Sequence, residues 1–256
     1  MKLVRFAWGD ERLYGILEND RIYSLRGQIF SEFWKGQESV HLHDVRLLMP
    51  VVPSKVVAVG RNYTTYDLGS GVPSTSMKVP TACIGPDEPV PYPSLSEQVI
   101  MEAELAIVLK AAAKNVPPER ALDHVLGYTV ANDFTARDLM RADGRPCRAK
   151  NFDGFCPLGP VIETELDPAD VRIWGRVNGE VKQEGSTKDM IASVPEVVAM
   201  FSEIMSLLPG DVILTATPSA PPYVKPGDVT EAEVEGVGAL RNPVVSAGAD
   251  GESHLG

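Results

Sequence analysis

Three acidic residues in or beside two apolar runs are the groups of this 256-residue chain best placed to do chemistry. Glu102 and Glu104 open the run IMEAELAIVLK, and Asp133 lies in the second run, GYTVANDFTARD. In a strand, side chains at positions i and i+2 point to one face, about 6.6 Å apart. Two carboxylates among apolar neighbours cost several kcal/mol to bury unpaired, so a positive group should lie between them.

A hard divalent cation is one candidate for that positive group. Three carboxylates without a neighbouring histidine or cysteine suit Mg²⁺ or Mn²⁺. The alternative is that Glu102 and Glu104 lie on the wet face of an edge strand and bind nothing. The spacing of the residues leaves both interpretations open.

The composition is that of a globular protein with a substantial core. Its apolar and charged fractions are 44% and 23%, and its formal net charge is −11. That charge argues against nucleic acid or an anionic membrane as a partner, because both need a basic surface. No apolar run approaches the roughly 20 residues of a membrane span, and acidic residues interrupt the N-terminus before a signal peptide could form. Three widely spaced cysteines fit reduced thiols in a cytoplasmic protein.

Short strands dominate the elements that must position these residues. Residues 2–25 alternate in a way that predicts a small antiparallel meander. Asn178-Gly179 predicts a type I′ hairpin turn, and Ser193 with Glu196 predicts a capping box at the start of a helix. The chain shows no βαβ alternation and no glycine-rich phosphate loop, which excludes Rossmann and P-loop folds. The predicted class is mostly β with a few helices (α+β).

Prolines near position 50 mark a domain boundary. We expect a small N-terminal β domain over residues 1–50, a catalytic domain over residues 51–245, and a disordered tail over residues 246–256.

Four stretches carry weaker local signals. Residues 30–34 favour a short helix. Residues 64–80 are rich in glycine, serine and proline, and we expect a surface loop of the kind that closes over a site. Residues 141–151 should be irregular. Arg137 and Asp138 should pair with each other rather than meet a substrate.

Seven stretches resemble the fumarylacetoacetate hydrolase family, in order over residues 53–244: PSKVVAVGRNY, EAELAIVL, ALDHVLGYTVANDFTARDL, KNFDGFCPLGP, VNGEVKQEGSTKDMI, PGDVILTATP and VEGVGALRNPV. The likeness is to the small bacterial members that are 2-hydroxyhepta-2,4-diene-1,7-dioate isomerases or 5-oxopent-3-ene-1,2,5-tricarboxylate decarboxylases. The resemblance implies a mixed β-sandwich or β-roll beside a small N-terminal β domain, in a homodimer.

The resemblance also implies a metal site and a catalytic residue. It assigns Mg²⁺ or Mn²⁺ to Glu102, Glu104 and Asp133. Lys150 matches the family lysine that acts beside the metal on a developing enolate, and Thr217 matches a threonine that holds a substrate carboxylate.

Two further residues are candidates for substrate binding, because polar and aromatic residues that follow a strand often bind ligands. Arg61 and Tyr63 follow the apolar run that ends at Gly60. Arg61 would anchor the far end of a dianionic substrate.

One type of chemistry accounts for these residues. A hard cation with open positions can chelate a 2-oxo acid and act as a Lewis acid on charge that develops as a C–C or C–H bond breaks. An ammonium adds electrostatic stabilisation to the enolate. We therefore expect a metal-dependent enzyme of aromatic compound catabolism, acting on a small anionic 2-oxo acid or β-dicarbonyl dicarboxylate as an isomerase or decarboxylase. The alternatives are an acylpyruvate or fumarylacetoacetate-type hydrolase, an oxaloacetate decarboxylase, and a catalytically silent homologue.

The chain departs from the family pattern around the pocket. Tyr66 and Gly69 stand where hydrolytic relatives carry a histidine and a glutamate that activate water. Water-activating chemistry is thereby weakened unless another loop residue substitutes. Met140 and Arg145-Pro146 replace a common Gln and a Gln-Trp pair, and Ala216 replaces the glycine of the T-G-T-P turn.

Overall fold

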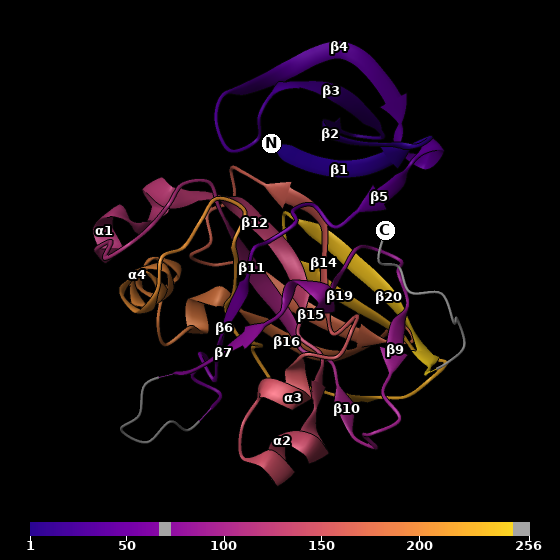
Figure 1. The fold of residues 1–256 in the computed structure, drawn as a ribbon, viewed down its shortest axis with the longest axis vertical. Helices are drawn as coiled ribbons and strands as arrows, with labels where there is room; N and C mark the ends of the chain where they lie inside the picture. Colours follow the sequence, from indigo (N-terminus) through magenta and orange to yellow (C-terminus); the bar gives the residue numbers. More distant parts are fainter. Residues whose placement is uncertain (67–72, 248–256) are drawn as a thin grey trace.

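The computed structural model describes residues 1–66 and 73–247, and most of its elements are strands (Figure 1). The strands are β1 (Lys2–Trp8), β2 (Glu11–Glu18), β3 (Arg21–Gly27), β4 (Phe33–His41), β5 (Arg46–Leu48), β6 (Val56–Gly60), β7 (Ser74–Lys78), β8 (Cys83–Ile84), β9 (Val90–Tyr92), β10 (Val99–Ile100), β11 (Ala103–Leu109), β12 (Val125–Asn132), β13 (Thr135–Ala136), β14 (Cys156–Glu163), β15 (Arg172–Val177), β16 (Glu180–Ser186), β17 (Val212–Leu214), β18 (Tyr223–Val224), β19 (Val229–Val234) and β20 (Gly238–Ser246).

The helices are few and short: α1 (Pro118–Ala121), α2 (Arg137–Asp143), α3 (Cys147–Lys150) and α4 (Val194–Ile204), with 3-10 turns at Leu42–Asp44, Pro80–Ala82, Leu122–His124 and Thr187–Asp189. The predicted capping box of Ser193 and Glu196 begins α4. No helix in the described parts of the chain is long and apolar enough to cross a membrane. The mostly β class is confirmed.

The largest sheet runs in the order β4-β3-β2-β1-β14-β12-β11-β17-β6-β7. Its central strands β11 and β12 are buried along their whole length. Continuous apolar runs, rather than alternating ones, are typical of strands covered on both faces. These two strands therefore form the centre of the sheet, and the three acidic residues lie in them or directly beside them.

A second sheet, in the order β16-β15-β19-β20-β9, packs against the first to make a layered sandwich. The alternating burial of β19 places one face in the core and the other towards solvent. The predicted hairpin joins β15 to β16, where Asn178 and Gly179 have φ of 53° and 82°. Both values are in the left-handed region that a type I′ turn requires.

The N-terminal strands lie at the end of the molecule opposite α2 and α3 (Figure 1). The meander predicted for residues 2–25 is confirmed as β1, β2 and β3, and β1 pairs with β14 of the central sheet. The helix predicted for residues 30–34 is wrong. Its last residues begin strand β4, which pairs antiparallel with β3, so sheet pairing overrides a weak helical pattern.

Two other expectations also fail. The loop predicted for residues 64–80 contains β7, which pairs with β6 and ends at the buried Lys78. The stretch 141–151, predicted to be irregular, holds the end of α2 and all of α3. Residues 67–72 of the predicted lid and residues 248–256 of the predicted tail lie outside the described residues.

Candidate active site

The pairing of β11 with β12 brings the predicted acidic residues together. Ala103 lies opposite Asn132, so Glu102 and Asp133 lie at the same end of the two strands, and the Asp133 amide donates to the Glu102 carbonyl at 2.8 Å. β11 is an interior strand between β12 and β17, and Glu104 is 2% exposed. A wet edge-strand position for Glu104 is therefore wrong.

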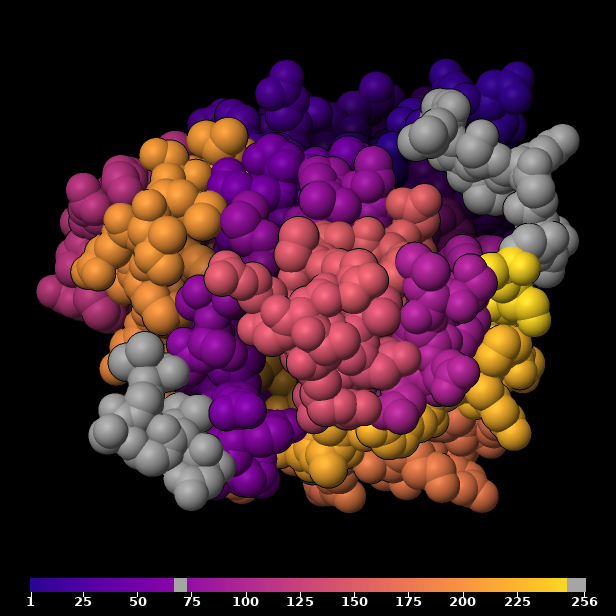
Figure 2. Space-filling view, turned by 60° about the horizontal axis from the view of Figure 1, so that its bottom comes forward, coloured from indigo at the N-terminus to yellow at the C-terminus, as the bar shows by residue number. Residues whose placement is uncertain are grey.

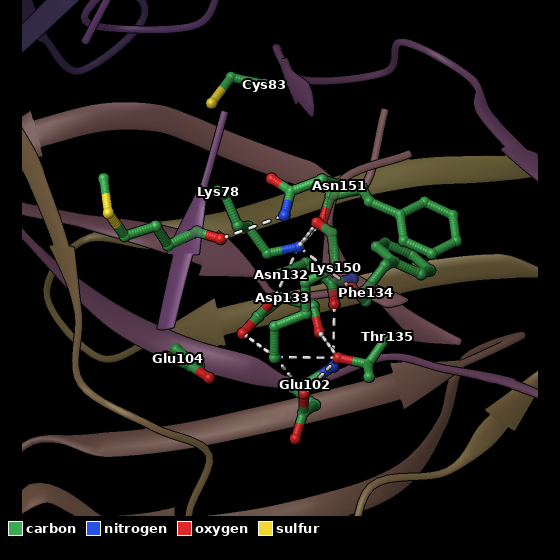
Figure 3. Close-up of polar contacts among 12 residues, drawn as sticks. Lys78, Cys83, Glu102, Glu104, Asn132, Asp133, Phe134, Thr135, Lys150 and Asn151 are labelled. Atoms are coloured by element: carbon green, nitrogen blue, oxygen red, sulfur yellow. Dashed lines mark hydrogen bonds and ion pairs between the residues drawn. The ribbon is translucent and has the colours of Figure 1, made fainter. Parts of the chain in front are cut away.

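The positive group between two of the carboxylates is the ammonium of Lys150. It donates to Glu102 Oε2 at 3.1 Å, to Thr135 Oγ1 at 2.9 Å and to Asp133 Oδ2 (Figure 3). Thr135 in turn donates to Glu102 Oε2 at 2.8 Å. Lys150 is the last residue of α3 and is buried. The network is therefore held by a helix on one side and by the two central strands on the other.

A second lysine, Lys78, contacts the same aspartate. Its ammonium lies 2.7 Å from Asp133 Oδ1. It also donates to the main-chain carbonyls of Phe155 at 2.6 Å, Lys150 at 2.9 Å and Phe134 at 3.0 Å. An ammonium has three N–H donors, and these carbonyls take all of them. Lys78 is 1% exposed, so its charge is fixed beside Asp133 and is not available to a ligand.

Three carboxylates face two ammonium groups, and the pKa shifts follow from that imbalance. Burial acts to raise the pKa of Asp133, but Lys150 and Lys78 outweigh it and hold the pKa below its usual range. Burial acts to lower the pKa of Lys150, but Asp133, Glu102 and Glu104 outweigh it and raise the pKa above its usual range. Burial, with Asp133 and Glu102 nearby, raises the pKa of Glu104 well above its ordinary value. Glu104 is therefore the carboxylate most in need of a further positive charge.

The polar partner of Glu104 is a main-chain amide. Ala216 donates its N–H to Glu104 Oε2 at 2.8 Å, and in Figure 3 Glu104 lies to one side of the lysine network without a contact to it. Ala216 has φ of 78°, and Arg61 has φ of 62°. A residue with a Cβ is strained in this region by about 1–2 kcal/mol. Backbone strain of this kind is concentrated at functional sites.

These residues line one cavity of about 690 Å³, which also takes in Arg61, Thr135 and Thr217. The structure thus brings together the predicted metal residues, the predicted catalytic lysine and two of the three predicted substrate-binding residues. Thr217 accepts a hydrogen bond from Gln183 Nε2 at 2.7 Å, which fixes the direction of its hydroxyl. Tyr63, the third candidate, is fully buried in the core and does not line the cavity.

The predicted pairing of Arg137 with Asp138 is wrong. Asp138 instead accepts from the Ser96 hydroxyl at 2.6 Å and from the amides of Glu97 and Leu139, each at 2.9 Å. These contacts join the first turn of α2 to the loop before β10. Arg137 is therefore not paired with Asp138, and it lines the cavity.

Tyr66 lines the cavity at the position where the hydrolytic pattern has histidine. Its hydroxyl donates to the Ser219 carbonyl at 3.0 Å. Burial, together with Glu102 and Glu104, raises the pKa of this phenol to about 12. Tyr66 therefore keeps its proton at neutral pH and does not replace a basic histidine.

The cavity offers a divalent cation a suitable set of donors. Glu102, Glu104 and Asp133 supply only oxygen atoms, which Mg²⁺ and Mn²⁺ prefer. Glu104 forms no hydrogen bond or ion pair with a described lysine. Within residues 1–66 and 73–247, however, no three His, Cys, Asp or Glu side chains are grouped closely enough to hold an ion. The Lys150 ammonium donates hydrogen bonds to two of the three carboxylates, those of Glu102 and Asp133. The chemistry of the donors fits a metal, and binding it requires the ammonium to give up those contacts.

Two residues that support the site, Lys78 and Gln183, could not be recognised from the sequence. Lys78 stands in STSMK, a polar stretch whose other side chains are not fully buried, and lysine is almost never fully buried unless it is paired. Gln183 stands in a hairpin strand that is mostly exposed. It accepts from the Ala103 amide at 3.1 Å and donates to Thr217, which joins β11 to the T-A-T-P turn across sheets distant in sequence.

Family comparisons cover nearly the whole chain. Residues 55–245 match the family described as fumarylacetoacetate (FAA) hydrolase, C-terminal, and residues 1–50 match the family described as Rv2993c-like, N-terminal. Protein Rv2993c of Mycobacterium tuberculosis (strain ATCC 25618 / H37Rv) is 46% identical over 215 residues, 81% of each chain. Oxaloacetate tautomerase fahd2, mitochondrial, of Xenopus laevis is 39% identical over 228 residues, 82% of this chain and 72% of the relative.

Solved structures show the same architecture. The 2-hydroxyhepta-2,4-diene-1,7-dioate isomerase from Mycobacterium marinum superposes with a TM-score of 0.91 at 41% identity, over 97% of this chain and 99% of that one. Maleylpyruvate hydrolase from Sphingobium sp. SYK-6, in complex with manganese(II) ion and pyruvate, has a TM-score of 0.82 at 27% identity, over 96% of this chain and all of that one.

Proposed function

Because the chain belongs to the fumarylacetoacetate hydrolase family, we propose that it is a divalent-metal-dependent enzyme that converts a small anionic 2-oxo acid through its enolate. The proposed reaction is isomerisation or decarboxylation of the 2-hydroxyhepta-2,4-diene-1,7-dioate type. One observation carries the proposal: three carboxylates and a buried ammonium meet at the wall of one cavity, and the carboxylate of Glu104 has no cation of its own.

Glu102, Glu104 and Asp133 would hold the ion, which is Mg²⁺ or Mn²⁺. When bound, the cation supplies Lewis-acid polarisation of the 2-oxo group. The manganese in the maleylpyruvate hydrolase complex supports a divalent ion in this family. The oxygen-only donor set of this chain is compatible with either metal.

Lys150 is the residue that would stabilise the enolate. Its raised pKa keeps it as an ammonium, so it donates a hydrogen bond and positive charge and does not act as a base. Charge-assisted hydrogen bonds in a buried site are worth more than in water. Thr217, oriented by Gln183, would donate its hydroxyl proton to a substrate carboxylate.

The groups that face the cavity favour enolate chemistry over hydrolysis. Among the described residues no histidine lines the cavity, and Tyr66 retains its proton at neutral pH because of its raised pKa. Hydrolysis of a C–C bond needs a base to activate water. Isomerisation, tautomerisation and decarboxylation also pass through an enolate but consume no water: decarboxylation forms the enolate by loss of CO₂, and the other two form it by giving up a proton to an acceptor such as solvent and regaining one at another atom. Keto–enol tautomerisation of oxaloacetate is the second candidate, supported by the Xenopus laevis relative.

Turnover measurements test the proposal. Purified protein with Mg²⁺ or Mn²⁺ is assayed against oxaloacetate, an acylpyruvate and 2-hydroxyhepta-2,4-diene-1,7-dioate. We expect turnover of at least one substrate, lost on chelation of the metal and in Glu102→Ala. Glu184→Ala is the matched control, because Glu184 is half-exposed and pairs with Arg172 on a hairpin strand outside the cavity. Metal binding without turnover would support a catalytically silent homologue, and absence of metal binding would overturn both.

A further inference from the structure

Two of the three cysteines are far apart in the sequence and are neighbours in the fold. Cys83 lies in β8 and Cys156 begins β14, and the two strands pair in parallel with Cys83 directly opposite Cys156. Both are free thiols, and the Cys156 thiol is hydrogen-bonded to that of Cys83. Strand pairing alone creates this contact, so the spacing of the cysteines in the sequence does not reveal it.

The backbone places the two side chains within reach of a disulfide bond. Neighbouring strands lie about 4.8 Å apart, and the side chains of paired residues lie on the same face of the sheet. A disulfide joins residues whose Cα atoms are roughly 4.4–6.8 Å apart. Directly paired strands meet this requirement near its short end, where a disulfide is strained and is therefore more easily reduced. The geometry thus suits a bond that forms and breaks more than a permanent one.

The surroundings of the pair suit an uncharged sulfur bridge. Cys156 is fully buried and Cys83 is 9% exposed, and both belong to a cluster of apolar core residues. The hydrogen bond to Cys83, together with burial, raises the pKa of the Cys156 thiol well above its ordinary value. Loss of the thiol protons leaves no buried acceptor unpaired: the Val79 carbonyl, which accepts from the Cys83 thiol at 4.0 Å, also accepts from the Ala82 amide at 3.0 Å.

The cysteine pair lies behind the candidate active site. Lys78, whose ammonium pairs with one of the acidic residues, precedes Cys83 by one short turn and donates to the carbonyl of Phe155 at 2.6 Å. Phe155 is the residue directly before Cys156. In Figure 3 Cys83 lies on the far side of Lys78 from Glu102. A bond between the cysteines would therefore join the two segments that hold Lys78 in place.

The same two segments also meet at the surface. The Val79 amide donates to Asn151 Oδ1 at 2.7 Å, and in Figure 2 purple atoms of the segment around residue 80 adjoin salmon atoms of the segment around residue 150. The chain between the two cysteines contains all three acidic residues and Lys150. A disulfide would close this part of the chain into a loop, and such a loop stabilises the folded state mainly by restricting the unfolded chain.

We propose that Cys83 and Cys156 are a reversible disulfide site, and that oxidation joins the segment carrying Lys78 to β14. The proposal is independent of the reaction that the cavity catalyses. The oxidant is a low-molecular-weight disulfide, RSSR. The more exposed Cys83 attacks one of its sulfurs as the thiolate, which forms a mixed disulfide and releases one RSH. Cys156 then attacks the Cys83 sulfur and releases the second RSH, so that two protein thiols are oxidised and one RSSR is reduced to two thiols that carry the two protons.

Thiol mapping of the folded, unaltered chain tests the proposal. The protein is incubated with glutathione disulfide, its free thiols are alkylated in denaturant, and its proteolytic peptides are identified by mass spectrometry. We expect the Cys83 and Cys156 peptides to be joined to each other, whereas the exposed Cys147 is alkylated or joined to glutathione. Dithiothreitol should return all three to thiols. The oxidised chain should melt about 5–10 °C above the reduced chain.

Three variants separate this pair from the remaining cysteine. Cys147→Ser is the matched control and should keep both the linked peptides and the rise in melting temperature, because Cys147 is exposed at the start of α3. Cys83→Ala and Cys156→Ala should each abolish both. The mapping of the unaltered chain decides the question even if a buried variant does not fold.

Several results would overturn the proposal. One is that Cys83 and Cys156 are still alkylated, or are joined only to glutathione, after the folded chain has been oxidised. Another is a disulfide between two chains, which electrophoresis without reductant would show as a dimer. A linked pair whose melting temperature does not rise would also overturn it, because the bond would then not stabilise the folded chain.

Discussion

The parallel strands β6 and β17 carry a buried aspartate–lysine pair at one end and the candidate active site at the other. At the end where both strands begin, Asp211 is fully buried and pairs with Lys55 at 2.5 Å. It also accepts from the Ser54 hydroxyl at 2.6 Å and from the Leu208 amide at 2.7 Å. One carboxylate meets one ammonium and neutral donors, so this end of the strands is balanced and calls for no ligand.

At the end where the same strands finish, the charges do not balance. Lys78 and Lys150 pair with Asp133 and Glu102 but not with Glu104. Burial, with Asp133 and Glu102 nearby, raises the pKa of Glu104. The comparison indicates that burial of charge alone does not identify a functional site. What identifies it is charge that the protein leaves uncompensated.

The largest expected effect comes from removing the uncompensated charge. Glu104→Gln keeps the shape of the side chain and an oxygen for the Ala216 amide, but removes a proposed metal ligand. We expect turnover to fall about 1,000-fold or more, equivalent to about 4 kcal/mol of transition-state stabilisation. Steady-state kinetics with Mg²⁺ measure the loss of turnover, and activity within 10-fold of the unaltered chain would contradict a role for Glu104 as a metal ligand.

The same variant should not harm the metal-free fold. A carboxyl whose pKa is raised in the folded state binds its proton more tightly there, so stability is highest below the unfolded-state pKa and falls as pH rises towards the folded-state pKa. Glu104→Gln lacks this penalty. Its melting temperature without metal, at mildly alkaline pH, should equal or exceed that of the unaltered chain. A large drop would mean that Glu104 has a structural role instead.

The balanced pair should show the reverse behaviour. Asp211→Asn leaves Lys55 without its buried partner, and breaking such a pair lowers the free energy of unfolding by about 3–5 kcal/mol. Metal affinity should stay within twofold, because Asp211 lies at the far end of β6 and β17 from the cavity. Denaturant unfolding and Mn²⁺ titration of the folded variant measure the two quantities.

Lys78 should affect both metal binding and stability, because it is buried like a structural lysine and also contacts Asp133, a proposed metal ligand. Lys78→Met should weaken Mn²⁺ binding about 10–100-fold, since outer partners that orient metal ligands typically contribute that much. It should also destabilise the protein, because the carbonyls of Phe134, Lys150 and Phe155 lose their donor. Unchanged metal affinity in a variant that still folds would reduce Lys78 to a purely structural role.

The smallest effect concerns the strained turn. Ala216→Gly removes the cost of a Cβ at φ of 78°, about 1–2 kcal/mol, and adds about 0.4–1 kcal/mol of unfolded-state entropy. The net expectation is a gain of about 0.5–1 kcal/mol in the free energy of unfolding, with no change in metal affinity. Thermal unfolding measures the gain, and a destabilised variant would show that the alanine methyl packs favourably.

Local sequence signals predicted those parts of the fold that depend on local chemistry. The Asn178-Gly179 turn and the Ser193–Glu196 capping box are set by residues a few positions apart. Both predictions are confirmed. The grouping of the three acidic residues followed from strand periodicity together with the family resemblance.

The remaining features depend on residues far apart in the chain. Strand β7 is polar, and its buried Lys78 is stabilised by carbonyls more than 50 positions away, so no local pattern could reveal it. Asp138 bonds to the loop at Ser96 instead of to Arg137, a choice that only tertiary packing makes. Tyr63 follows the strand that leads to the site, yet its side chain turns into the core.

A crystal structure of the chain with Mn²⁺ and oxalate would show whether the three acidic residues bind a metal ion, because anomalous scattering locates the manganese without ambiguity. We expect one ion at about 2.0–2.2 Å from oxygens of Glu102, Glu104 and Asp133, with the Lys150 ammonium moved from its contacts with Glu102 and Asp133 towards the oxalate. An ion bound elsewhere, or no ion and Lys150 still between the two carboxylates at saturating Mn²⁺, would contradict this expectation.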